Sequence, residues 1–96
     1  MPEPSDNTQR REVHYSGRVQ GVGFRYTVRS LAARRDVTGF VRNLADGRVQ
    51  LVAEGPPEEI DALLDAVRRE MGRYMDDEQQ ESGPAKGEFE RFGVRM

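Results

Sequence analysis

The first part of the chain alternates apolar and polar positions and then changes its period. In the first segment every second position is apolar or glycine: Val13, Tyr15, Gly17 and Val19. A period of two indicates a half-buried β-strand. After two glycines the apolar positions recur at helical spacing: Phe24, Val28, Leu31 and Ala32. This change predicts a strand followed by an amphipathic helix that packs one face on a core.

Residues 38–54 predict a β-hairpin. Apolar residues of the first arm lead to Ala45-Asp46-Gly47, and Val49, Leu51 and Ala53 alternate on the return. Asp-Gly between two such runs favours a tight turn, because both turn positions tolerate a positive φ.

A second helix is predicted after Gly55-Pro56-Pro57. Prolines suit the first turn of a helix, and Glu58 and Glu59 favour its positive dipole end. The buried stripe consists of Ile60, Leu63, Leu64, Val67 and Met71. Gly72 is expected as the C′ residue that ends the helix.

The C-terminal part has a weaker pattern. Tyr74 and Met75 begin like a strand, but residues 76–81 show no apolar alternation. We expect either an edge strand with both faces in water or a strand whose middle is loosely held. Gly83-Pro84 predicts a turn. The last apolar residues predict a short terminal strand: Phe89, Phe92, Val94 and Met96.

The predicted order is β-α-β-β-α-β, with a possible extra terminal strand. Two helices that each bury one face imply two layers, with both helices on one face of a mainly antiparallel sheet. This is an α+β, ferredoxin-like sandwich. Residues 1–9 predict a disordered N-terminal tail, and residues 10–96 a single domain. The fold does not decide the function, because sensors, RNA readers and enzymes share it.

Composition narrows the chemistry. The chain has no cysteine and one histidine, His14, which excludes disulfides, a cysteine nucleophile and histidine-cluster metal sites. The net charge is −2, but arginines gather in residues 10–48 and acids in residues 54–90. An anionic ligand is therefore expected at the first half, and general nucleic-acid binding is not. No apolar run approaches the roughly 20 residues that span a bilayer, and a cytoplasmic location is expected by default.

The junction between the first strand and the first helix is the candidate site. Gly21 and Gly23 allow successive backbone N–H groups to line one concavity there. Arg25 lies on the first helical turn, where the dipole disfavours a cation, and a bound phosphate would account for its position. A Gly-x-Gly before a helix is more often a plain tight connection, and Asn43 near a hairpin is more often structural. These residues alone leave both interpretations open.

Two longer motifs add a resemblance. The nonapeptide Gly17-Arg18-Val19-Gln20-Gly21-Val22-Gly23-Phe24-Arg25 resembles the phosphate-loop signature of the acylphosphatase family. The second signature of that family is similar to Gly39-Phe40-Val41-Arg42-Asn43, followed by Asp46-Gly47 and residues 49–55. The resemblance covers about residues 11–96 and points to the small stand-alone bacterial type.

The resemblance implies a hydrolase that cleaves the carboxyl–phosphate anhydride bond of acyl phosphates. It implies that Arg25 holds the phosphoryl group and that Asn43 positions the attacking water. The backbone amides that it implies for phosphate binding are those of Gln20, Gly21, Val22, Gly23 and Phe24. It implies neither a metal nor a cofactor. Inorganic phosphate or sulfate is the expected inhibitor, and a monomer that binds neither nucleic acid nor a membrane is expected.

Other classes of function stay open. A ferredoxin-like small-molecule sensor would bind without turnover. An RNA reader would need aromatic residues within a basic pattern on its central strands. Tyr15 and Phe40 are present, but the basic pattern and an overall positive charge are missing. A domain of a larger carbamoyl-transfer protein would share the first motif, but the sequence to Met96 lacks the zinc-finger cysteines that such a protein needs.

Several polar residues receive no catalytic role. His14 is expected on a sheet face without an acid partner. Arg18 and Arg42 are expected to add positive potential only. Thr27 supports either the helix or the site, and the sequence does not separate these. The acid-rich residues 76–81 are expected to face solvent.

Overall fold

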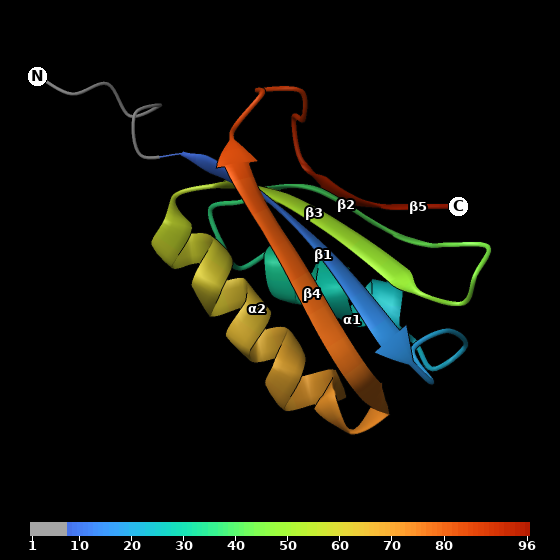
Figure 1. The fold of residues 1–96 in the computed structure, drawn as a ribbon. Helices are drawn as coiled ribbons and strands as arrows, with labels where there is room; N and C mark the ends of the chain where they lie inside the picture. The colour runs from blue at the N-terminus through green and yellow to red at the C-terminus, as the bar shows by residue number, and fades with distance from the viewer. Residues whose placement is uncertain (1–7) are drawn as a thin grey trace, which may run out of the picture.

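The computed structural model describes residues 8–96, and most of the expected tail lies outside this range. In chain order the elements are β1 (Gln9–Gly17), α1 (Phe24–Ala32), β2 (Thr38–Asn43), β3 (Val49–Gly55), α2 (Pro57–Met71), the 3₁₀ turn η2 (Gly72–Tyr74), β4 (Met75–Pro84) and β5 (Phe92–Arg95) (Figure 1). The predicted β-α-β-β-α-β order and the extra terminal strand are confirmed. The sheet begins at Gln9, one residue before the predicted domain boundary.

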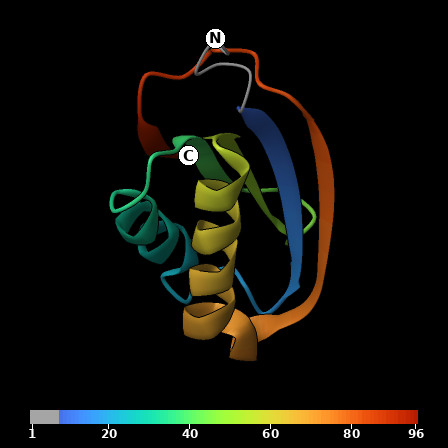
Figure 2. The same cartoon turned by 90° about the vertical axis from the view of Figure 1, so that its left-hand side faces the viewer.

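The five strands form one mixed sheet in the order β4-β1-β3-β2-β5. Neighbouring strands run antiparallel except for β2 and β5, which are parallel. Both helices pack against the same face of the sheet (Figures 1 and 2). The fold is therefore the predicted α+β two-layer sandwich. The order places β3 between the strand that leads into the candidate loop and the strand that ends in Asn43.

The core lies between the helices and the sheet. Its inward strand residues and the predicted stripes of both helices are buried: Val13, Tyr15, Val41, Val49, Leu51, Phe24, Val28, Ala32, Ile60, Leu63, Leu64, Val67 and Met71. Leu31 is only half-buried at the margin. Val19, predicted as the last inward residue of the first strand, is fully buried although β1 ends at Gly17. Its side chain therefore anchors the loop that follows.

Two predictions about chain reversals are wrong in detail. In the hairpin Gly47 has a positive φ of 96° while Asp46 does not, so the turn does not have the expected two positive φ angles. Gly47 N–H donates to the Leu44 carbonyl at 3.1 Å, so Ala45-Asp46-Gly47 forms a three-residue loop. Gly72 has a right-handed φ of −59°, because the chain continues from α2 directly into η2.

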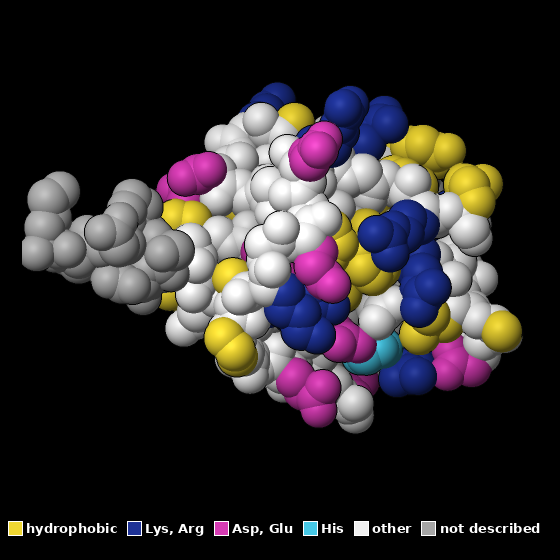
Figure 3. Space-filling view, turned by 90° about the horizontal axis from the view of Figure 1, so that it is seen from above, with side chains coloured by type: hydrophobic (Ala, Val, Ile, Leu, Met, Phe, Trp, Pro, Cys, Tyr) yellow, Lys and Arg dark blue, Asp and Glu magenta, His cyan; other side chains and the backbone are white. Residues whose placement is uncertain are grey.

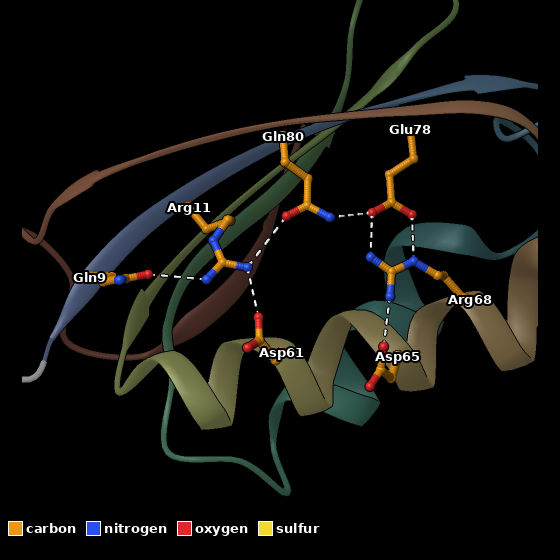
Figure 4. A network of polar contacts seen from close by, with 7 residues as sticks. All are labelled: Gln9, Arg11, Asp61, Asp65, Arg68, Glu78 and Gln80. Carbon is orange, nitrogen blue, oxygen red and sulfur yellow. Dashed lines mark hydrogen bonds and ion pairs between the residues drawn. The ribbon is translucent and has the colours of Figure 1, made fainter.

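The polar C-terminal segment forms an edge strand, as the first of the two expectations states. β4 pairs with β1 along its length, except at Asp76, where the register shifts between Ser16 and Gly17, and most of its side chains are exposed. Glu78 is the exception to the expected solvent-facing run. It points towards α2, where it receives two hydrogen bonds from Arg68, at 2.9 and 2.7 Å (Figure 4). Burial would raise the pKa of Glu78, but the hydrogen bonds from Arg68 and Gln80 lower it overall.

Arg11 extends this polar network towards the other end of α2. It is a buried residue of β1 whose Nη1 donates to Asp61 Oδ1 at 2.8 Å and to Gln80 Oε1 at 3.3 Å. Its Nη2 donates to Gln9 Oε1 at 3.0 Å (Figure 4). Side-chain pairs across the α2 face therefore hold a strand that has almost no apolar side chains to bury.

The segment after β4 folds over the helix-free face of the sheet. The predicted turn at Gly83-Pro84 is wrong, because both residues still belong to β4. Phe89, which the sequence predicts to belong to the terminal strand, lies before β5 and packs edge-on against Phe40, with ring centroids 5.8 Å apart. The Arg95 guanidinium stacks on Phe40 at 3.9 Å. In the view from above, basic side chains flank exposed hydrophobic atoms (Figure 3).

Candidate active site

The loop between β1 and α1 has a left-handed backbone at two positions. Gly21 and Gly23 have φ angles of 79° and 80°. A Cβ atom at either glycine would meet nothing within 4 Å, so the dihedral angle and not the available space requires glycine here. Gly23 is also the N-cap of α1, which has no side-chain cap and no acidic residue in its first turn.

The backbone N–H groups of this loop are unpaired. Within residues 8–96, no carbonyl or side chain accepts a hydrogen bond from the amides of residues 20–24. The first intrahelical bond runs from Thr27 N–H to the Gly23 carbonyl at 3.0 Å. Unpaired amides at the start of a helix produce positive potential and attract anions. The loop therefore offers several fixed donors that have no acceptor in the described part of the chain.

Arg25 reaches from the first turn of α1 to the end of β5. It is half-buried, and its Nη1 lies 3.3 Å from the Arg95 carbonyl oxygen and 3.4 Å from Met96 Sδ. Its guanidinium also lies 5.9 Å from the Tyr26 ring centroid. Each of these partners is uncharged, so the guanidinium has no carboxylate to neutralise it among residues 8–96.

Asn43 is the last residue of β2. Strand alternation places its side chain on the same face as the fully buried Val41, which is the face that the helices cover. Its side chain is half-buried and makes no hydrogen bond to any residue in the range 8–96. Arg42 points to the opposite face, where its Nε donates to Gln50 Oε1 at 2.7 Å.

Two contacts place Asn43 near the loop and Arg25. Gln20 Nε2 donates to the carbonyl of Leu44, the next residue after Asn43, at 2.8 Å. Arg25 reaches the carbonyl of Arg95, whose strand partner is Arg42, the residue before Asn43. Figure 1 shows the loop, the β2–β3 turn and the end of β5 on the same side of the molecule. The structure thus brings the three predicted parts of the site to one end of the sheet.

Three residues to which the sequence assigned no catalytic role are His14, Arg18 and Thr27. His14 is on the helix-free face of β1, and its Nε2 lies 3.5 Å from Glu12 Oε2, so the expectation that it has no acid partner is wrong. Arg18 is exposed in the loop, and Thr27 is half-buried on α1. Among residues 8–96, no group of three or more His, Asp or Glu residues is placed to hold a metal ion.

The sequence predicted a role for the backbone amide of Gln20 but none for its side chain. Its Nε2 donates both to Leu44 O and, at 3.0 Å, to Arg48 O. These two carbonyls flank the turn of the hairpin. A signal was present, because Gln20 is polar and lies between the apolar Val19 and a glycine, but its partners are more than 20 residues away along the chain.

The β2–β3 turn next to the site is held by a charged pair. Asp46 accepts the Arg48 N–H at 3.0 Å and the Arg48 Nε at 2.8 Å. The hydrogen bond from the Arg48 amide, followed by that from its side chain, lowers the pKa of Asp46. Asp46 therefore stays ionised at neutral pH and fixes the loop that carries the Gln20 acceptors.

Among the described residues, neither α1 nor α2 is long and apolar enough to cross a membrane.

Comparisons with known proteins agree on one family. The family model described as Acylphosphatase matches residues 11–94. An acylphosphatase of Salinibacter ruber is 58% identical over 52 residues, which are 54% of this chain and 55% of that protein. The chain thus spans about half the length of that relative. One of Methylococcus capsulatus is 44% identical over 88 residues, covering 90% of this chain and 95% of the relative.

A solved structure gives the same result for the fold. The acylphosphatase of Coxiella burnetii superposes with a TM-score of 0.85 at 32% identity, over 99% of this chain and 100% of the other. The match includes both the loop after β1 and the hairpin that carries Asn43, since it extends over nearly the whole chain. By sequence and by structure, the chain belongs to the acylphosphatase family.

Proposed function

We propose that the chain hydrolyses acyl phosphates to a carboxylate and inorganic phosphate. The observation that carries the proposal is the set of unpaired amides at residues 20–24, with the guanidinium of Arg25 on the first turn of α1 directly after them. Family membership supports the same activity. The relevant ligand chemistry is a phosphoryl dianion, since several fixed donors and one cation lie in this segment and no carboxylate within residues 8–96 pairs with that cation.

In this proposal Arg25 and the loop amides bind the three non-bridging phosphoryl oxygens. Arg25 now donates to a neutral carbonyl and a thioether, which are weaker acceptors than a phosphate oxygen. Binding of a dianion would therefore replace those contacts with stronger ones. Because the amides are fixed by Val19 and by the start of α1, they need little reorganisation as charge shifts in the transition state.

Asn43 would orient the water that attacks phosphorus. The water oxygen forms a new P–O bond while the bond to the acyl oxygen breaks, and the electron pair leaves with the carboxylate. The proton of the water passes to a phosphate oxygen. A carboxylate is a good leaving group, so no side chain has to protonate it. An uncharged carboxamide is sufficient for this task, and the Asn43 side chain has no competing partner within residues 8–96.

The direct test is hydrolysis of benzoyl phosphate and acetyl phosphate by the purified chain in the presence of EDTA. We expect turnover that inorganic phosphate inhibits competitively. In ¹⁵N-resolved spectra, phosphate should shift the amide resonances of residues 20–24 more than those of the β4–α2 flank, the surface that carries Arg11, Asp61, Arg68, Glu78 and Gln80.

Each other outcome has a distinct meaning. Shifts at the loop without any turnover would instead support a binding module, and neither shifts nor turnover would refute the site. A cytoplasmic location and a monomeric state stay predictions.

A further inference from the structure

The two halves of the proposed site are not neighbours in the sheet. The amides of residues 20–24 follow β1, whereas Asn43 ends β2, and β3 lies between these strands. No backbone ladder therefore connects the phosphate loop directly to Asn43. Attack by an oriented water requires the two parts to stay aligned within a fraction of an ångström. A side-chain contact between the loop and the end of β2 would align the two parts directly, which backbone strand pairing does not do here.

The carboxamide of Gln20 makes such a contact. Its Nε2 lies 2.8 Å from the Leu44 carbonyl and 3.0 Å from the Arg48 carbonyl. Leu44 is bonded to Asn43 in the chain, and its N–H donates to the Arg48 carbonyl at 2.8 Å, which closes the base of the turn. One side chain from the phosphate loop is thus attached to both ends of the turn that follows Asn43.

The chemistry of the contact suits glutamine. Both acceptors are carbonyl oxygens, so the atom that faces them has to donate two hydrogen bonds, as a carboxamide NH₂ can. Glutamate would place an acceptor against two acceptors, and methionine has a similar length but no donor. Gln20 is half-buried, so water does not freely replace a lost donor.

We propose that Gln20 is a positioning residue that holds the phosphate loop in register with Asn43. The inference rests on the proposed function, in which the loop binds the phosphoryl group and Asn43 orients the water. Phosphate binding needs the loop and Arg25, which are continuous in the chain. The attack needs both halves. Loss of the Gln20 contact therefore affects kcat more than the affinity for phosphate.

The first measurement compares kcat with the inhibition constant of phosphate for Gln20→Met. We expect kcat to fall about 10- to 100-fold, as for a small misplacement of reacting groups. The inhibition constant should change by less than about threefold. Gln50→Leu is the matched control, because Gln50 lies on the same hairpin and its carboxamide makes two hydrogen bonds on the opposite face. It should leave kcat unchanged.

The decisive measurement is a double-mutant cycle with Asn43→Ala. If Gln20 acts by aligning Asn43, Gln20→Met should lower kcat by less than about threefold once Asn43 is absent. A general structural role would lower kcat by the same factor in both backgrounds. If Gln20→Met does not fold, Gln20→Asn replaces it in the cycle, since it keeps the donors on a shorter side chain and should lose part of the activity.

The outcomes separate the two proposals. A wild-type chain that does not hydrolyse acyl phosphates overturns the proposed function and the positioning role with it. The positioning role alone is overturned if the wild type is active but Gln20→Met leaves kcat unchanged. It is also overturned if Gln20→Met lowers kcat by the same factor with and without Asn43. Turnover by the wild type together with the non-additive result supports both.

Discussion

The proposed phosphate loop, residues 20–24, and the β4–α2 flank differ in whether their hydrogen-bond donors have acceptors in the described chain. On the flank, Arg68 pairs with Glu78 and with Asp65, and Arg11 has three acceptors. In the loop, the amides of residues 20–24 have no acceptor within the described chain. Both regions are rich in donors. Within residues 8–96 the flank supplies acceptors for most of its guanidinium N–H groups, the buried Arg11 Nε excepted, and the loop supplies none for its amides.

This difference separates a stabilising arrangement from a binding one. Donors that the chain already pairs contribute to folding and have little left for a ligand. Donors that the chain leaves unpaired make the empty loop less stable. An anion that binds there supplies the missing acceptors, so these donors contribute to binding. Changes in the loop should therefore alter activity, and changes on the flank should alter stability. The following predictions test this separation, from the largest expected effect to the smallest.

Arg25→Ala should have the largest effect on activity. The variant loses the guanidinium that is proposed to hold the phosphoryl group, and kcat/KM should fall by about 10³ or more, since a single oxyanion donor commonly contributes 10²–10³. The free energy of unfolding should change by less than about 0.5 kcal/mol, because the Arg95 carbonyl, Met96 Sδ and the Tyr26 ring, which Arg25 contacts, are all uncharged. Steady-state kinetics and urea unfolding measure the two quantities.

Arg29→Ala is the matched control for that experiment. Arg29 lies one turn further along α1, is exposed and also contacts the Tyr26 ring, at 5.4 Å. Its loss should leave kcat/KM within about twofold of the wild-type value. If both variants lose activity equally, general positive potential and not a specific grip on the phosphate explains the effect.

Gly23→Ala should affect both activity and stability. Alanine at the observed φ of 80° costs about 1–2 kcal/mol, although the space around it is free. Relief of that strain would turn the loop amides away from their common direction and weaken inhibition by phosphate. Gly72→Ala provides the contrast, since Gly72 has a right-handed φ of −59°. It should be neutral or slightly stabilising. Equal destabilisation by the two changes would contradict this explanation.

Arg68→Met should lower stability without changing kcat. The pair with Glu78 has two hydrogen bonds, but Arg68 is 43% exposed and solvent screens it, so we expect a loss of about 1 kcal/mol. The loss should shrink as sodium chloride is added. Arg69→Met is the control, because Arg69 is exposed and forms no ion pair within residues 8–96. A fall in kcat for Arg68→Met would show that the flank and the site are coupled.

The smallest effect concerns Glu54 and pH. Burial would raise the pKa of Glu54, but the N–H groups of Lys86 and Gly87 and the guanidinium of Arg10 lower it overall, below 4.5. A lowered folded pKa gives stability that is present above pH 4.5 and is lost as the pH falls through the folded pKa. The difference in unfolding free energy between wild type and Glu54→Gln should therefore narrow from neutral pH to about pH 3. A constant difference would refute this linkage.

The local pattern of the sequence determined much of this protein. The two helices, strands β1 to β3 and their buried stripes follow from periods of two and of 3.6 residues, which nearby residues alone create. The candidate loop is also local, since Gly21, Gly23 and Arg25 lie within five residues. The resemblance of the two motifs then indicated the family.

Tertiary structure decided what depends on partners far along the chain. The polar segment of β4 becomes an ordered edge strand because β1 and α2 supply its pairing, which no local period encodes. Gly72 stays right-handed because η2 continues the helix, and Gln20 finds its acceptors on a hairpin 24 and 28 residues away. Side-chain hydrogen bonds depend on which strands become neighbours, so they appear only when the whole sheet has formed.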